Sequence, residues 1–371
     1  MKKLITAIGL MSGTSCDGID ASIIKSDGED ELSLIGDFFL PYEEKTRIRI
    51  RTFKEKIDKV LDLQANKNEI ADLEKEITLL HFKATNLLLE KLKIDKSKID
   101  LIGLHGHTIF HSFNYKKTKQ LGDGKALSEL MDLNVIYDFR ENDLKNGGQG
   151  APLVPIFHKL LKKKFKLKGP VVFINIGGIS NLTYLDNNNE MISFDSGPGN
   201  CLIDKYLQLK SNGKTQFDKK GEIAFKGQVD KNILDTYLSN PYYESLPPKS
   251  LDVNDFNLSS VRGLNLENTI TTLSELTALT IVNSLNFFSH KPHKIILCGG
   301  GRKNDYIYDR VKKISNTSTI NIDNYKINGD FIESQAFAYL AIRSFFKKPI
   351  SFPKTTGVLK PMTGGKLIQF K

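Results

Sequence analysis

A short polar turn near the N-terminus contains residue types that bind phosphate. An apolar run enters the stretch 5–24 and an alternating run leaves it, which predicts a strand, a turn and a second strand. Glycines let backbone N–H groups approach an anion, hydroxyl groups add donors, and carboxylates can hold a hydrated cation. This composition suggests a nucleotide phosphate with magnesium, and an ordinary hairpin tip is the alternative. The residues concerned are Gly13, Thr14, Ser15, Asp17, Gly18 and Asp20.

Two later stretches of the chain also contain a glycine turn that follows a predicted strand. The stretch 169–185 again predicts strand, turn and strand, about 165 residues after the first, which indicates two related halves. The strand 294–298 runs into Gly299, Gly300 and Gly301 and then into a helix over 304–314, which Asn304 could cap. No Gly-Lys-Ser/Thr sequence closes the first turn, so it is not a Walker A loop. Two turns for a polyphosphate and a third against which a nucleobase can lie favour the actin-like, sugar-kinase-type ATPase fold.

The other elements alternate strands and helices, which predicts an α/β protein. The clearest helix covers 66–92, where apolar residues recur at helical spacing. The stretch 210–263 is predicted to be irregular, and the loop 142–155, rich in glycine and proline, is the best candidate for a domain crossing. Further helices are predicted over 43–63, 201–209, 264–288 and 330–346, and further strands over 100–104, 135–137 and 191–194.

The composition is typical of a soluble globular protein. The chain has 371 residues, of which 40% are hydrophobic and 26% are charged. No apolar run reaches the roughly 18–20 residues of a membrane span, so no membrane partner is expected. The N-terminal lysines and apolar residues run straight into the polar turn without a small-residue cleavage site. A first strand is therefore favoured over a signal peptide.

Charge and cysteine content bear on partners and compartment. A net charge of +10 could indicate a nucleic-acid partner. The excess is scattered lysine, and no nucleic-acid-binding module is recognisable, so a solvated surface is favoured and no nucleic-acid partner is expected. The cysteines, Cys16, Cys201 and Cys298, are odd in number and widely spaced, which gives no disulfide framework and fits a reducing cytoplasm.

A series of motifs extends over nearly the whole chain. In order they are GLMSGTSCDGID, HGHTIFH, QLGDG, DFREND, GGQGAPLVP, INIGGISNLTYL, FDSGPGN, PPKS, LCGGGRKN and ESQAFAYLA. In these motifs the chain resembles the anhydro-N-acetylmuramic acid kinases, which are bacterial. The resemblance implies a homodimer with a two-lobed actin-like ATPase (ribonuclease H-like) fold and an ATP cleft between the lobes. We expect an N-terminal lobe of residues 1–139 plus 346–371 and a C-terminal lobe of residues 140–345.

The resemblance also implies a reaction. Enzymes of this family take 1,6-anhydro-N-acetylmuramic acid from recycled cell wall, open its anhydro bridge with water, and use ATP to phosphorylate the 6-oxygen. The product is N-acetylmuramic acid 6-phosphate. Asp195 matches their general base, which takes a proton from the attacking water. Its alternative role is that of a turn or helix N-cap aspartate.

Three turns match the ATP-binding turns of the family. The turn over 13–20 matches a phosphate turn, in which Asp17 or Asp20 could hold Mg²⁺ through water. A second phosphate turn is matched by Asn175, Gly177, Gly178 and Asn181, and an adenosine turn by Gly299, Gly300, Gly301 and Asn304. Turn geometry alone is the alternative for each glycine cluster.

The resemblance assigns a further set of residues to the sugar. Arg140 could pair with the lactyl carboxylate, since a guanidinium forks onto carboxylates. Glu333 matches an acidic residue that opens the last helix of the family, and a surface first-turn glutamate is the alternative. The set is His105, Thr108, Arg140, Gln149, Gly150, Ala151 and Glu333.

Some features leave alternatives open. His105, His107 and His111 could converge on zinc, but no cysteine or carboxylate pattern accompanies them, so zinc is disfavoured. The family usually has glutamine at His107, a methionine or leucine at Cys16, and a different continuation at 251–254. The first and last of these departures leave the sugar contacts open. A kinase for another amino sugar, or a non-catalytic ATP-binding protein on the same fold, is therefore the alternative function.

Overall fold

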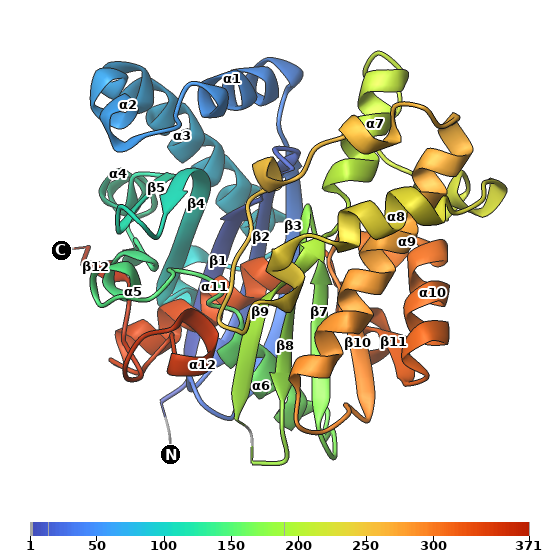
Figure 1. The fold of residues 1–371 in the computed structure, drawn as a ribbon. Helices are drawn as coiled ribbons and strands as arrows, with labels where there is room; N and C mark the ends of the chain where they lie inside the picture. The colour runs from blue at the N-terminus through green and yellow to red at the C-terminus, as the bar shows by residue number, and fades with distance from the viewer. Residues whose placement is uncertain (1–2, 14, 189, 371) are drawn as a thin grey trace. The chain divides into compact units, whose positions relative to one another are not determined.

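The computed structural model describes residues 3–13, 15–188 and 190–370 (Figure 1). The chain divides into two compact units, here called unit 1 (Met1–Lys164 with Phe331–Lys371) and unit 2 (Phe165–Asp330). These bounds differ from the expected lobe boundaries, because residues 140–164 and 331–345 belong to unit 1 rather than to the C-terminal lobe. The physical reason is packing: the helix over 332–345 lies against the sheet of unit 1.

Unit 1 contains a mixed sheet. The strands run in the order β12-β6-β4-β1-β2-β3, and β5 pairs with β4. β1 is antiparallel to β2 and parallel to β4, so the predicted hairpin at 5–24 is confirmed. The bounds are β1 Ile5–Ser12, β2 Gly18–Ser26, β3 Leu32–Pro41, β4 Leu101–Ser112, β5 Lys117–Leu121, β6 Val135–Tyr137 and β12 Lys366–Ile368.

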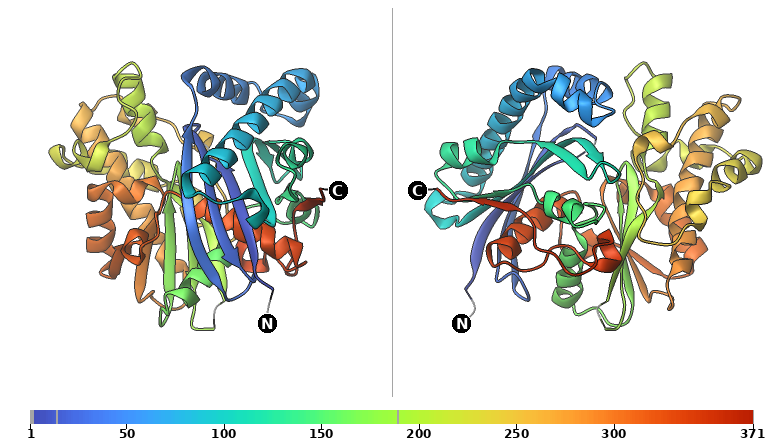
Figure 2. Two further views of the ribbon diagram at one scale, coloured as in Figure 1. Left: turned by 180° about the vertical axis from the view of Figure 1, so that it is seen from behind. Right: turned by 60° about the vertical axis from the view of Figure 1, so that its left-hand side comes forward.

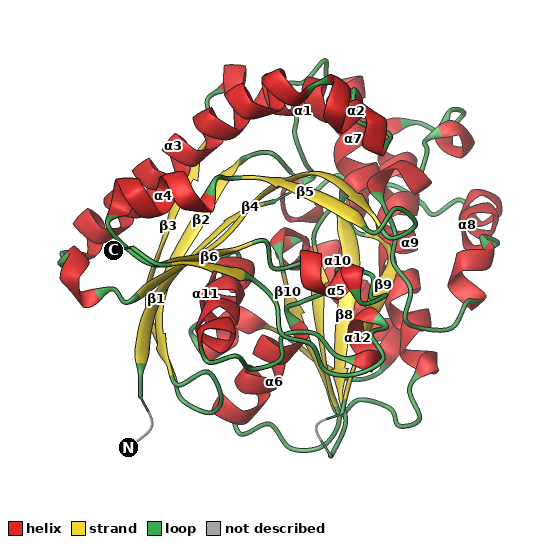
Figure 3. Cartoon of the chain, turned by 90° about the vertical axis from the view of Figure 1, so that its left-hand side faces the viewer, coloured by secondary structure: helices red, strands yellow, loops and turns green. Residues whose placement is uncertain are grey.

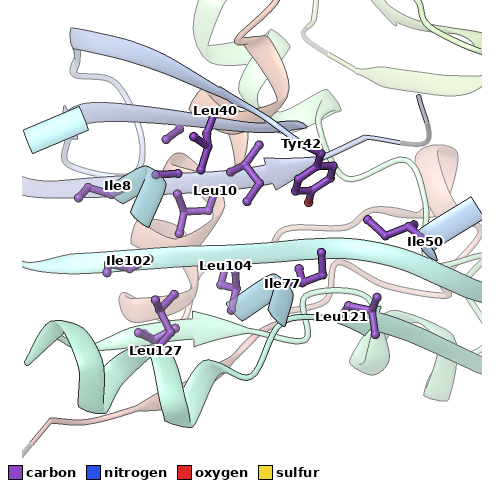
Figure 4. Close-up of a cluster of buried hydrophobic side chains, with 14 of the residues drawn as sticks. Ile8, Leu10, Leu40, Tyr42, Ile50, Ile77, Ile102, Leu104, Leu121 and Leu127 are labelled. Carbon is purple, nitrogen blue, oxygen red and sulfur yellow. The ribbon is translucent and has the colours of Figure 1, made fainter. Parts of the chain in front are cut away.

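Helices cover both faces of this sheet, as Figure 3 shows for α3 and α11. Ile77 of α3 lies in one apolar core with Ile8 and Leu10 of β1 (Figure 4). Gly9, between them, points to the opposite face, where an added Cβ would lie 1.9 Å from the Ser334 carbonyl oxygen of α11. The helix bounds are α1 Glu44–Glu55, α2 Val60–Ala65, α3 Lys67–Leu92, α4 Gly124–Met131, α5 Glu141–Lys145, α6 Pro155–Lys164, α11 Ile332–Phe345 and α12 Pro353–Thr356.

Unit 2 repeats the strand arrangement of unit 1. Its sheet has the order β11-β10-β7-β8-β9, with β7 antiparallel to β8 and parallel to β10. This matches β6-β4-β1-β2-β3 strand for strand, so the expectation of two related halves is confirmed. The bounds are β7 Val171–Ile176, β8 Ile179–Leu185, β9 Met191–Pro198, β10 Lys294–Cys298, β11 Ser318–Asn321, α7 Cys201–Lys210, α8 Lys231–Leu238, α9 Leu266–Ser284 and α10 Asp305–Ser315.

A core of unit 2 lies between its sheet and its helices. Side chains of β7, β8 and β10 pack there with those of α9 and α10. These two helices are orange in Figure 2. Asn304 caps α10 as predicted, because its Oδ1 accepts the Ile307 N–H at 3.1 Å. Among the described residues, none of the helices combines the length and the hydropathy that a membrane span needs.

Candidate active site

The first phosphate turn connects β1 to β2. Ser15 and Asp17 are exposed, and Ser15 Oγ donates a hydrogen bond to Asp17 Oδ1 at 2.7 Å. Asp20 lies near the start of β2 and is partly buried. The structure therefore places two carboxylates and a hydroxyl in or beside one turn. Thr14 lies outside the described residues.

His107 joins the two ends of this turn. Its Nδ1 lies 2.9 Å from Ser12 Oγ, and its Nε2 lies 3.6 Å from Cys16 Sγ. Ser12 Oγ also accepts the Tyr42 hydroxyl at 2.8 Å. Burial lowers the pKa of His107 to about 3, so the ring is neutral near pH 7. Cys16 and His107, two departures from the family pattern, thus form one contact beside the phosphate turn.

The histidines at 105, 107 and 111 do not form a metal site. His105 Nδ1 lies 2.9 Å from the Gly106 carbonyl oxygen, and its Nε2 accepts the Arg140 Nε–H at 3.1 Å. The ring nitrogens of His111 contact a threonine hydroxyl and the Gln149 carbonyl. Within the part of the chain that the structure describes, no group of three or more His, Cys, Asp and Glu residues is placed to hold a metal ion. The zinc alternative therefore has no geometric support.

A register shift in β4 places His105. Leu104 pairs with Leu10, and Gly106 pairs with Met11, so His105 is the extra residue of a β-bulge. Gly106 has a φ of +78°, and an added Cβ would lie 2.1 Å from a backbone oxygen. Glycine is required there, and the bulge re-aims the His105 side chain. The HGHTIFH motif thus lies within a strand that is longer than the predicted 100–104.

Arg140 connects His105 to the glycine loop of the GGQGAP motif. Its Nε donates to His105 Nε2, and its Nη1 donates to the Gly150 carbonyl oxygen at 2.8 Å. Burial and the Arg140 charge hold the pKa of His105 well below its usual value, which keeps the ring neutral and able to accept. Burial raises the pKa of Glu333, in the first turn of α11, and the Arg140 charge opposes this. His105, Arg140, Gly150 and Glu333 are thus brought into one neighbourhood of unit 1.

Asp143 and Thr356 anchor the glycine loop. Asp143 accepts the Gly150 N–H and the Thr356 hydroxyl, each at 2.6 Å. The Gln149 N–H donates to the Thr356 carbonyl oxygen at 2.7 Å. Gly150 has a φ of +75°, and an added Cβ would lie 2.8 Å from His111 Cε1. The loop is therefore fixed by residues far apart in the sequence.

Thr108 and Ala151, the two remaining sugar-side residues, also lie in unit 1. Thr108 Oγ1, on β4, accepts the Gln120 Nε2–H at 3.2 Å. Ala151 follows Gly150 and is partly buried. Their roles in sugar binding stay predictions.

Three polar residues form a row across the sheet of unit 2. Asn175 on β7 pairs with Asn181 on β8, which pairs with Asp195 on β9. Directly opposed residues of antiparallel strands share a face, so these three side chains lie side by side. Each is partly exposed in an otherwise largely buried strand. The row places a carboxylate beside two carboxamides.

Asp195 lies inside β9, which excludes its alternative role as a helix N-cap or turn aspartate. The N-cap of α7 is Asn200, whose side chain makes no capping hydrogen bond. The register of β8 and β9 shifts by one residue at Ser196, next to Asp195. A β-bulge therefore lies beside Asp195 in unit 2, and the β-bulge of unit 1 contains His105.

The second phosphate turn is supported from behind by the segment after β9. The Gly177 carbonyl accepts the Asn200 N–H at 2.8 Å, and the Gly178 carbonyl accepts the N–H groups of Gly199 at 2.9 Å and Cys201 at 3.2 Å. An added Cβ at Gly199 would lie 2.2 Å from the Gly177 carbonyl oxygen. The FDSGPGN motif therefore holds the hairpin tip in place.

The segment Tyr242–Leu251, here called the Asp195 loop, wraps around Asp195. The Tyr242 hydroxyl donates to the Asp195 carbonyl oxygen at 2.6 Å, and the Asp195 N–H donates to the Lys249 carbonyl oxygen at 3.1 Å. The Leu251 N–H donates to Asp195 Oδ2 at 2.8 Å. The donor of this last bond is a backbone N–H, which every residue except proline has. The contact is therefore kept although residue 251 departs from the family pattern.

Arg302 fixes the third turn. Its Nη1 donates to the Gly299 carbonyl oxygen at 2.9 Å and to Asp330 Oδ1 at 2.6 Å, while its Nε and Nη2 form a fork onto Asp323. This hydrogen bonding holds the pKa of Asp323 below its usual value. Gly299 has a φ of +74°, which favours glycine. The turn is thus held by a buried guanidinium that the sequence did not single out.

One glycine in each turn has no packing reason to be glycine. An added Cβ would meet nothing closer than 3.7 Å at Gly13 and 3.4 Å at Gly177, and nothing within 4 Å at Gly300 among the described residues. None of the three has a positive φ. At Gly301, by contrast, an added Cβ would lie 2.3 Å from Ile176 Cγ2. A close approach by a ligand would explain the three open glycines.

The repeated strand order, with a glycine-bearing hairpin in each unit, defines an α/β protein of the two-lobed actin-like ATPase and sugar-kinase class. Among solved structures, component A of (R)-2-hydroxyglutaryl-CoA dehydratase from Acidaminococcus fermentans is similar with a TM-score of 0.49 at 10% identity, over 92% of this chain and 100% of that chain. A ROK family glucokinase from Streptomyces griseus is similar with a TM-score of 0.43 at 11% identity, over 91% of this chain and 99% of that chain.

Sequence comparison identifies the family within this class. Residues 5–369 match the model of the anhydro-N-acetylmuramic acid kinase family. An anhydro-N-acetylmuramic acid kinase of Pelagibacter ubique is 45% identical over 378 residues, which cover 100% of both chains. One of Brucella canis is 38% identical over 98% of this chain and 99% of its own length. The chain belongs to the anhydro-N-acetylmuramic acid kinase family, and the resemblance in its motifs is confirmed.

Proposed function

We propose that this chain opens the anhydro bridge of 1,6-anhydro-N-acetylmuramic acid with water and transfers the γ-phosphate of ATP to the freed 6-oxygen. The product is N-acetylmuramic acid 6-phosphate, and the reaction serves peptidoglycan recycling. Family membership over residues 5–369 supports the activity. The observation that carries the chemistry is the row of Asn175, Asn181 and Asp195, which places one partly exposed carboxylate beside two carboxamides on the sheet of unit 2.

The proposed step needs one base. Asp195 takes a proton from water, and the water oxygen forms a bond to C1 of the sugar. The bond between C1 and the bridge oxygen breaks, and this oxygen stays on C6. It attacks the γ-phosphorus of ATP in line, and ADP leaves. The Leu251 N–H on Asp195 Oδ2 holds the carboxylate in one orientation during proton transfer.

We assign the ATP phosphates to the hairpin turns of 13–20 and 175–181, and the adenosine to the turn of 299–301. Gly13, Gly177 and Gly300 support this assignment because no packing contact with another described residue requires glycine at these positions. Asn304 is a weaker adenosine candidate, since its carboxamide oxygen already caps α10. The sugar is assigned to the neighbourhood of His105, Arg140, Gly150 and Glu333.

Asp17 and Asp20 fit a hydrated Mg²⁺. They provide the oxygen donors that this ion prefers, and Mg²⁺ commonly binds one or two carboxylates together with substrate phosphates rather than an all-protein cage. When bound, the ion would neutralise charge on the phosphates. The contact of Ser15 with Asp17 keeps that carboxylate beside the turn, and Asp20 is fixed by its place on β2. We further propose a cytoplasmic homodimer, as the family resemblance implies.

The test of this function is a coupled assay of ADP release. We expect turnover with 1,6-anhydro-N-acetylmuramic acid and ATP, and little with N-acetylmuramic acid or N-acetylglucosamine. Faster turnover of another amino sugar would favour a kinase of different specificity. ATP binding without turnover of any sugar would favour a non-catalytic protein. The departures at 107 and 251–254 make these alternatives worth separating.

Alanine substitutions at neighbouring glycines test the adenosine turn. Gly300→Ala is expected to raise the KM for ATP several-fold and to leave the melting temperature unchanged or slightly higher, because the added methyl meets no protein atom. Gly301→Ala is expected to cost about 1–3 kcal/mol of folding free energy, because its methyl would clash with Ile176. Initial-rate kinetics and thermal unfolding check both. An unchanged KM for ATP in Gly300→Ala would remove this turn from the nucleotide site.

A further inference from the structure

Lys249 occupies an unusual position for a lysine. Only 8% of its surface is exposed. Its ammonium donates to the carbonyl oxygens of Tyr242 at 2.9 Å and Tyr243 at 3.4 Å. Its own carbonyl accepts the Asp195 N–H. One side chain thus ties the beginning of the Asp195 loop to its end, and its backbone ties the loop to β9.

Aromatic rings enclose the same ammonium. Its nitrogen lies 4.3 Å from the ring centre of Phe287, 4.6 Å from that of Tyr242 and 5.5 Å from that of Phe194. Phe194 directly precedes Asp195 on β9. Cation–π attraction and the two carbonyl bonds therefore hold the charge at the base of the loop. Burial of a charge is costly, and an apolar side chain would fill the space more cheaply.

We propose that Lys249 is a positioning residue for Asp195, and that its ammonium holds the Asp195 loop in the conformation that orients the Asp195 carboxylate. This inference rests on the proposed function for its effect on turnover. Its structural part stands alone, because it concerns the order of the loop. The Tyr242 hydroxyl, which bonds to the Asp195 carbonyl oxygen, lies at one end of the segment that the ammonium closes. The Leu251 N–H, which bonds to the Asp195 carboxylate, lies two residues beyond the other end.

The proposal predicts a dependence on pH. Burial lowers the pKa of Lys249 to about 8, so the ammonium is present below this pH and is lost above it. The ring of Tyr242 faces the ammonium, and Tyr243 contacts it through its carbonyl oxygen. Burial raises the pKa values of both tyrosines, so both stay neutral in this range. Asp195, the acidic group on the adjoining strand, is the proposed base. We therefore expect kcat to fall as the pH rises through about 8.

The experiment compares the wild type with Lys249→Met, and uses Lys210→Met as a matched control. Lys210 also lies over an aromatic ring of unit 2, at 5.5 Å from the centre of Tyr206, but is exposed. Hydrogen exchange of the full chain, followed by mass spectrometry, is measured over the Asp195 loop and β9. We expect exchange to rise roughly tenfold in these segments for Lys249→Met alone. Unchanged exchange would overturn the proposal whether or not the sugar is a substrate.

Kinetics provide the second measurement. For Lys249→Met we expect kcat to fall roughly tenfold or more, because a misplaced base reacts poorly, while the KM for ATP stays unchanged. The decline of kcat near pH 8 should also vanish. If Lys249→Met does not fold, Lys249→Arg replaces it, since arginine stays charged at this pH. A decline in Lys249→Arg identical to that of the wild type would overturn the role of the ammonium.

Discussion

Asp195→Asn is expected to reduce kcat by roughly 10²–10⁴-fold, the usual contribution of a general base. An asparagine oxygen can still accept the Leu251 N–H, and the backbone bonds to Tyr242 and Lys249 do not involve the side chain. Only the ability to take a proton is lost. The melting temperature and ATP affinity should therefore match those of the wild type. Steady-state kinetics, thermal unfolding and calorimetric titration with ATP measure these three quantities.

Asp186→Asn provides the matched control for this variant. Asp186 lies at the other end of the same strand pair, where its Oδ1 accepts the Glu190 N–H at 2.7 Å. Its substitution should leave kcat unchanged. Near-normal turnover by Asp195→Asn would show that another group activates the water.

Arg140→Ala is expected to raise the KM for the sugar by roughly 10–100-fold, since hydrogen bonds to charged groups contribute about 1.5–3 kcal/mol each. The guanidinium bonds to His105 and to the Gly150 carbonyl, so its loss loosens the glycine loop as well as removing a cation. The KM for ATP should change little. Arg140→Lys should recover only part of the effect, because an ammonium cannot form the planar fork.

A second sugar separates the two roles of Arg140. The analogue 1,6-anhydro-N-acetylglucosamine lacks the lactyl carboxylate. If Arg140 binds that carboxylate, Arg140→Ala should lose the preference of the wild type for the muramic acid. An equal loss with both sugars would limit Arg140 to holding the loop. Arg49→Ala, which removes an ion pair with Glu76 on the same unit, serves as the control and should change neither KM.

The parts of the fold that the sequence predicted are those that local signals determine. The hairpins follow from glycine turns between alternating strands, and Asn304 was a recognisable helix cap. The helix α8 was missed inside a stretch predicted to be irregular, although Asp230 caps it by accepting the Ile233 N–H. Strand β3 received no prediction.

The features that sequence analysis missed depend on partners far away in the chain. The predicted strand 191–194 ended just before Asp195, yet pairing of Asp195 with Asn181 extends the strand. Asp143 was part of a quoted motif, but its partner Thr356 lies 213 residues later. Lys249 and Arg302 also lie within the motifs, but their hydrogen bonds to the carbonyl oxygens of Tyr242 and Gly299 are visible only in the folded chain. The bounds of the two units also differ from the expected lobes because of a contact between distant parts of the chain: α11 packs on the sheet of unit 1.

The most direct measurement is the reaction in H₂¹⁸O with ATP and 1,6-anhydro-N-acetylmuramic acid, followed by rapid reduction of the product and mass spectrometry. The proposed chemistry predicts one ¹⁸O atom at C1 of the sugar, none in the phosphoester, and one ADP for each sugar phosphate. Asp195→Asn should form the labelled sugar phosphate and ADP roughly 10²–10⁴-fold more slowly. Label in released inorganic phosphate without sugar phosphate, or label in the oxygen between C6 and phosphorus, would contradict it.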